Sequence, residues 1–221
     1  MRLTEAIGQL TATVIEWDGL LVNPEYVHRG ETITWQAFDR PMLPESVRFS
    51  DVARMAEGRQ YSFQLLTDGS LFQLYYRYER DGTTLTNSTL SYYEGKSDSQ
   101  DVDEEETIDP TTDDERSFAR WLRIDFDSAD RRCALHNDCH LHLSGLPGGR
   151  VVLDGVPNPK QFVDLVMAWC YPDLYAEHCL DGGHKGAYRE ARRQEWVHED
   201  GFPSVDDVLF RQLIHLRVPR R

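Results

Sequence analysis

LFQLYYRY, residues 71–78, carries the strongest fold signal in this 221-residue chain, because it is filled with aromatic and apolar residues that favour strands. Similar stretches lie on either side, over Tyr61–Leu66 and Thr84–Tyr93. The segments between them contain Asp68–Gly69 and Asp81–Gly82, and Asp-Gly pairs are typical of hairpin turns. The pattern predicts a three-stranded antiparallel meander.

Three further short strands are expected downstream, over Trp121–Phe126, His140–Ser144 and Arg150–Leu153. Turn-forming residues separate them, at 128–130 and again at the LPGG of 146–149. Together with the meander they predict one sheet of about six strands.

Helices are expected near both ends of the chain. Apolar residues recur every three or four positions over residues 3–17 and, more weakly, over 45–57. Pro159 opens a helix that is expected to end before Pro172, and the tail predicts helices over 186–197 and 204–216. This order predicts an α+β fold in which helices cover one face of an antiparallel sheet. We expect a single domain over 1–221, with 176–221 as a C-terminal helical extension.

Acidic residues are concentrated between Ser97 and Glu115, which hold ten of them and no Lys or Arg. Such a segment has little to bury, so residues 97–112 are expected to form an exposed, partly disordered loop. The net charge of −14 argues against direct binding to nucleic acid, which requires clustered basic residues. The longest apolar stretches are far shorter than a membrane span and the N-terminus lacks the layout of a signal peptide, so we expect a cytoplasmic protein.

The densest group of chemically active residues is CALHNDCHLH, residues 133–142. Zinc is commonly held by Cys and His at short spacings, so the candidate metal ligands are Cys133, His136, Cys139 and His140. The interpretation that we favour needs no cofactor: Cys139 packs inward while His140 and His142 form hydrogen bonds on the polar face of a strand. Zinc remains the alternative.

Side chains alternate between the two faces of a strand, and this alternation predicts a polar patch. Arg123, Asp125 and Asp127 share one face, as do His140, His142 and Ser144. If the two strands pair, Arg123, Asp125, His140 and His142 meet, and Arg77 is placed to join them. Such a patch suits acid–base catalysis, a metal ion or an anion, or it is plain cross-strand ion pairing.

Several motifs in this order resemble those of an uncharacterised prokaryotic domain family. The motifs are YYRYE (75–79), WLRIDFD (121–127), His136 with HLHLSG (140–145), RVV (150–152) and PNPKQFV (157–163), ending at Tyr171. The likeness covers about residues 60–175, and residues 176–221 fall outside it. Asn137 stands where the family has a proline. The resemblance implies small cytoplasmic proteins of mobile-element, toxin–antitoxin and anti-phage loci. It singles out, as ligand-binding or partner-binding positions, Arg77, Arg123, Asp125, His136, His140 and His142.

Two main functional hypotheses follow. The first is a non-enzymatic accessory or antitoxin-like protein of a prokaryotic defence system, which binds a protein partner encoded at the same locus. It rests on the acidic segment, the resemblance and the absence of nucleotide-binding, GxSxG and HExxH motifs. The alternative is a metal-dependent or acid–base hydrolase or nuclease, with Asp125, His140 and His142 as candidate catalytic residues. A small-ligand sensor is the third hypothesis.

Overall fold

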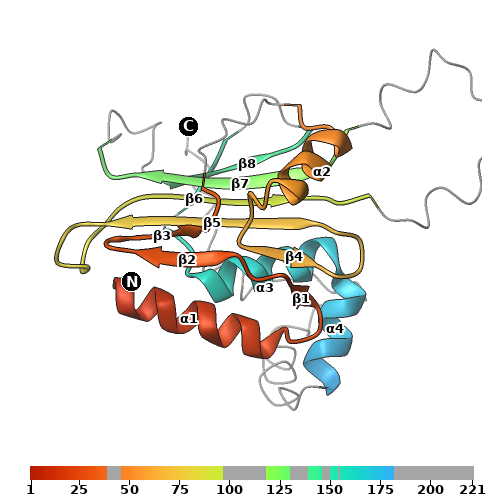
Figure 1. The fold of residues 1–221 in the computed structure, drawn as a ribbon, viewed down its shortest axis with the longest axis horizontal. Helices are drawn as coiled ribbons and strands as arrows, with labels where there is room; N and C mark the ends of the chain where they lie inside the picture. The colour runs from red at the N-terminus through yellow and green to blue at the C-terminus, as the bar shows by residue number, and fades with distance from the viewer. Residues whose placement is uncertain (39–45, 97–117, 130–138, 146–149, 154, 182–221) are drawn as a thin grey trace, which may run out of the picture.

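The computed structural model describes residues 1–38, 46–96, 118–129, 139–145, 150–153 and 155–181 (Figure 1). The elements follow the order α1 (Leu3–Glu16), β1 (Leu21–Val22), β2 (Tyr26–Arg29), β3 (Thr32–Trp35), α2 (Phe49–Glu57), β4 (Phe63–Leu65), β5 (Leu71–Tyr78), β6 (Leu85–Tyr93), β7 (Trp121–Asp127), β8 (Cys139–Leu143), β9 (Val151–Val152), α3 (Pro159–Cys170) and α4 (Pro172–Asp181). The expected α+β class with an antiparallel sheet is confirmed.

All strand pairs in the sheet are antiparallel, and the main path runs β1-β4-β5-β6-β7-β8-β9. The predicted meander is present as β4, β5 and β6. The sheet has more strands than the six expected, because the N-terminal part also contributes. The β2–β3 hairpin turns at Gly30, whose φ of 56° suits glycine, and pairs with the end of β5.

One face of the sheet packs against α1 and α3, which lie together below it in Figure 1. Helix α1 contributes Ala6 and Leu10, whose 3–4 spacing places them on one side. Phe162 and Val166 contribute in the same way from α3. The sheet supplies the alternate residues of its central strands: Phe72, Leu74, Tyr76, Leu90, Tyr92, Leu122, Ile124 and Leu141.

Helix α3 begins as the sequence predicts. The Asn158 side chain accepts a hydrogen bond from the Gln161 amide at 2.9 Å, and the Asn158 amide donates one to Gln161 Oε1 at 3.0 Å. A further helix, α4, starts at Pro172, and its His178 ring stacks on Trp17 with ring centroids 4.0 Å apart. The helices expected over 186–197 and 204–216 lie outside the described residues.

Helix α2 packs on the other face of the sheet, at one end. Its Val52 and Met55 form a second core with Leu71 and Tyr93. Beyond α2, the same face carries half-buried polar side chains on β6, β7 and β8. This partly open face is where the candidate site lies. None of the helices seen in the described part of the chain has the length and apolar character needed to cross a membrane.

Candidate functional site

Residues on the open face form rows that run across the strands. In one row Gln73, Ser91, Arg123 and His142 are successive cross-strand partners. The next row joins Tyr75, Thr89, Asp125 and His140, and a third joins Arg77, Asn87 and Asp127. The antiparallel pairing of β7 with β8 and the shared face of Arg123, Asp125, His140 and His142 are therefore as expected. The opposite faces of these strands bury Leu122, Ile124 and Leu141.

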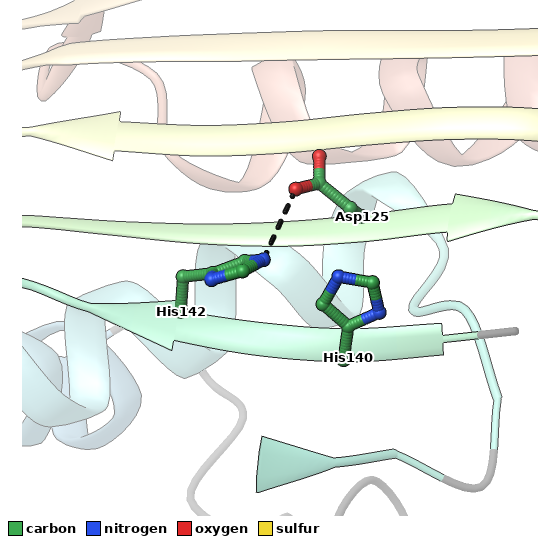
Figure 2. Close-up of side chains that lie close together, drawn as sticks. All are labelled: Asp125, His140 and His142. Carbon is green, nitrogen blue, oxygen red and sulfur yellow. Dashed lines mark ion pairs between the residues drawn. The ribbon is translucent and has the colours of Figure 1, made fainter. Parts of the chain in front are cut away.

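Asp125, His140 and His142 form a compact cluster, which Figure 2 shows rising from two adjacent strands. One ligand atom from each residue lies within 4.8 Å of the others. The His142 Nε2 atom is 3.4 Å from Asp125 Oδ2, and the two histidine rings meet edge to face with centroids 4.7 Å apart. All three side chains are half-buried, so the cluster is held by the sheet and reached by solvent.

Asp125 is the centre of the polar contacts. Its Oδ2 accepts a hydrogen bond from Arg123 Nε at 2.7 Å, and its Oδ1 accepts one from Thr89 Oγ1 at 3.2 Å. Burial acts to raise the pKa of Asp125, but the contact with His142 and the charge of Arg123 outweigh burial and hold that pKa below its usual value. Asp125 is therefore a carboxylate at neutral pH, ready to orient an imidazole or bind a cation.

The other predicted site residues fall into two groups. Arg77 shares the face but not the cluster: with Tyr75, Asn87 and Asp127 it lines an open polar hollow of about 740 Å³. Cys139 points into the core beneath the sheet and is 4% exposed, so the structure does not bring it together with His140. Cys133 and His136 lie outside the described residues.

Comparison with protein families gives one match. The family of uncharacterized conserved proteins called DUF2290 matches residues 23–213. The chain belongs to the DUF2290 family. No curated protein and no solved structure matches the chain.

The DUF2290 match is wider than the span of 60–175 over which the motifs resemble an uncharacterised family. It includes every strand of the site and continues into the C-terminal part beyond residue 175, but it begins after α1. The likeness to an uncharacterised family is thereby confirmed. The association with defence loci stays a prediction.

Sequence reasoning missed Thr89 as a partner of Asp125, because the sequence carries only part of the signal for this contact. The meander was predicted, and the turn at Asp81–Gly82 brings β6 back along β5. What was missing was the pairing of β6 with β7, which places Thr89 beside Asp125 across a connection of more than 25 residues. No turn type fixes the register over a connection of that length.

Proposed function

We propose that the protein is a metal-assisted hydrolase whose metal ligands are Asp125, His140 and His142. The observation that carries this proposal is the approach of one ligand atom from each residue to within 4.8 Å of the others. Ligand atoms at such separations can surround a single ion once the side chains turn toward it. The metal class that suits two imidazoles and a carboxylate is zinc.

The donor set also fits the chemistry of hydrolysis. Catalytic zinc sites use three protein ligands and leave a position open, where the ion lowers the pKa of a water molecule and makes it a nucleophile at neutral pH. Here the three ligands come from one side of the sheet, because His140 and His142 are two residues apart on β8 and Asp125 lies opposite His140 on β7. Their outer side faces the partly open surface.

The neighbouring residues support the ligands from outside. Thr89 donates to the Asp125 oxygen that does not contact His142, and so fixes the rotation of the carboxylate. Partners of this kind orient metal ligands in characterised metal sites. Arg123 balances the charge of Asp125.

The proposal is tested by titrating zinc into the full chain after treatment with a chelator. We expect one zinc ion per chain, and an affinity lower by at least about 100-fold in His140→Ala and in Asp125→Asn. His28→Ala is the matched control, because His28 is exposed on β2. Zinc binding that is equal in wild type and in the His140→Ala/His142→Ala double variant contradicts this site.

Activity is measured on chromogenic p-nitrophenyl esters with zinc-loaded protein. We expect hydrolysis that disappears with the chelator, returns with zinc and is absent in Asp125→Asn. Thermal melting of each variant shows whether the sheet is intact. Hydrolysis by wild type that persists in the chelator contradicts the metal-assisted mechanism.

Protein–protein contact is the second candidate function, and the acidic segment favours it. Ten acidic residues between Ser97 and Glu115 create a negative field that attracts a basic surface. Residues 97–112 lie outside the described residues, so this candidate rests on charge alone. An association of this type weakens as salt is added, and that dependence is its test.

A further inference from the structure

Arg123 lies beside the metal ligands with most of its hydrogen-bonding capacity unused. It is the cross-strand partner of His142, and its side chain is 30% exposed. Its Nε donates to Asp125 Oδ2 at 2.7 Å, and within the described part of the chain this is the single hydrogen bond that the guanidinium makes. A guanidinium has five N–H groups, so both terminal nitrogens are left to donate elsewhere.

The stability gained from the Arg123–Asp125 ion pair does not by itself account for an arginine at position 123. A half-exposed ion pair contributes at most about 1 kcal/mol, and an arginine used for structure commonly binds a carboxylate with both arms of its fork. Here the bond to Asp125 runs through Nε, and no hydrogen bond joins Asp125 to the edge formed by the two terminal nitrogens. That edge has the geometry that binds two oxygens of a phosphate.

We propose that Arg123 binds the phosphoryl group of a phosphate monoester whose phosphorus lies next to the metal ion. This inference rests on the proposed function and names its substrate class. Oxygens of the phosphoryl group contact the ion and the terminal nitrogens of Arg123 together. Because Arg123 is tied to Asp125 through Nε, its orientation relative to the ion is set before the substrate arrives.

The reaction is the hydrolysis of the ester bond. The oxygen of a water molecule forms a bond to phosphorus, and the bond from phosphorus to the ester oxygen breaks with its electron pair leaving on that oxygen. A proton from the water passes to the leaving oxygen, so the products are an alcohol and inorganic phosphate. Arg123 and the ion stabilise the charge on the remaining phosphoryl oxygens.

The alcohol part of the substrate binds in the polar hollow. Its residues Arg77, Asn87 and Asp127 form the row next to Asp125, and positions two apart on a strand are about 6.7 Å apart. Tyr75 belongs both to the lining of the hollow and to the row of Asp125. Acidic, basic and amide groups together suit a leaving group with several hydroxyl or amine groups.

The test compares the binding of inorganic phosphate by zinc-loaded protein, without free zinc, in wild type, Arg123→Gln and the control Arg29→Gln. Arg29 is exposed on β2 and its guanidinium bonds to the Gln36 carbonyl oxygen. We expect Arg123→Gln still to load one zinc ion per chain and to bind phosphate about 10- to 100-fold more weakly. Arg29→Gln is expected to match the wild type in both.

A second readout compares p-nitrophenyl phosphate with the neutral p-nitrophenyl acetate. Arg123→Gln is expected to lower kcat/KM for the phosphate ester about 10- to 100-fold more than it lowers kcat/KM for the acetate, and Arg123→Lys is expected to lie between. Equal losses on both esters, or unchanged phosphate binding in Arg123→Gln, overturn the inference while zinc binding stands. Failure of the wild type to bind zinc overturns the proposed function and this inference with it.

Discussion

Tyr171 Oη donates a hydrogen bond of 2.6 Å to Asp68 Oδ2, which joins the end of α3 to the turn between β4 and β5. The Tyr171 oxygen also lies 2.7 Å from Ser70 Oγ and 2.6 Å from Tyr92 Oη. Since the single phenolic proton goes to Asp68, Ser70 and Tyr92 donate to Tyr171. Burial and the neighbouring Tyr92 hold the pKa of Tyr171 well above its usual value, so this network stays intact through the physiological pH range.

Tyr171→Phe is therefore expected to lower the free energy of unfolding by about 1–3 kcal/mol, because it leaves partly buried donors and an acceptor without their partner. The melting temperature falls by about 2–4 °C for each kcal/mol in a chain of this size. Tyr78→Phe is the control: the Tyr78 hydroxyl is buried and makes no hydrogen bond in the described structure, so its removal is expected to be neutral or stabilising. Equal effects of the two changes contradict the assigned role of the network.

A second close contact lies in the same region, at Gly95. A Cβ atom on Gly95 would lie 2.6 Å from Gly69 C and Ser70 N, both of which are backbone atoms that cannot rotate away. Gly95→Ala is expected to destabilise the protein by about 3 kcal/mol. Gly8→Ala is the matched control, because it lies inside α1 with nothing within 4 Å of its Cβ position, and it is expected to stabilise by about 0.5–1 kcal/mol. Chemical denaturation measures both, and a tolerated Gly95→Ala contradicts the close approach.

The central strands are predictable because their strand-forming residues and the turn-forming residues between them indicate the same meander. Leu71–Tyr78 combines strand-forming residues with Asp-Gly turns on both sides, and the structure places β5 at the same residues. The β2–β3 hairpin carried a similar signal around Gly30 but was not predicted, because each strand has only four residues. The sequence pattern does not predict α4, because Pro172 marks the end of the preceding helix, although proline is equally suited to the first turn of a new one.

The site was predictable as a shared face, but not in its contacts. Alternation along β7 and β8 is enough to place Asp125, His140 and His142 on one side. It does not specify that Asp125 lies opposite His140 while making its ion pair with His142, since that depends on register and rotamers. The same alternation predicts that Cys139 packs inward, and the structure confirms it; the alternative zinc set joined Cys139 to His140, but neighbours in a strand face opposite sides.

Thr89→Val is expected to weaken zinc binding about 10-fold, because it removes the hydroxyl that orients Asp125 and keeps the shape of the side chain. The free energy of unfolding is expected to fall by no more than about 1 kcal/mol, since water can reach the freed carboxylate oxygen. Thr86→Val is the control: it lies on the same strand and donates to the Arg77 carbonyl oxygen instead. Titration calorimetry on both variants checks the prediction, which an unchanged zinc affinity in Thr89→Val would contradict.

Replacement of residues 97–112 by a short Gly-Ser linker is expected to leave the fold intact. The ends of the connection are already held together, because the Glu94 amide donates to the Arg120 carbonyl oxygen at 2.9 Å and Arg120 Nε donates to Glu94 Oε1 at 2.9 Å. The segment itself is rich in acids and poor in groups that pack. A melting temperature that drops by more than about 4 °C, roughly 1 kcal/mol here, is the contrary result.

The last prediction distinguishes a hydrolytic function from a partner-binding function. It uses the double variant His140→Ala/His142→Ala. The chain is co-expressed with the products of neighbouring genes, and complex formation is measured at low and at high salt. If the acidic segment mediates contact, the complex is lost as the Debye length shrinks below its physiological value of about 8 Å. A variant with the acids of 97–112 changed to Asn and Gln then loses the complex at all salt concentrations, while the histidine variant keeps it.

The histidine variant is expected to lose zinc binding and ester hydrolysis and to retain both the complex and most of its stability. That outcome gives the two surfaces separate roles, because the histidines act through the ion and the acids through their field. If the histidines instead serve the sheet, the same variant leaves Asp125 with Arg123 as its one ionic partner among the described residues and lowers the melting temperature, with no hydrolysis to lose. If the histidine variant also loses the complex, the open face itself is the surface that binds the partner. That result would contradict a hydrolytic site.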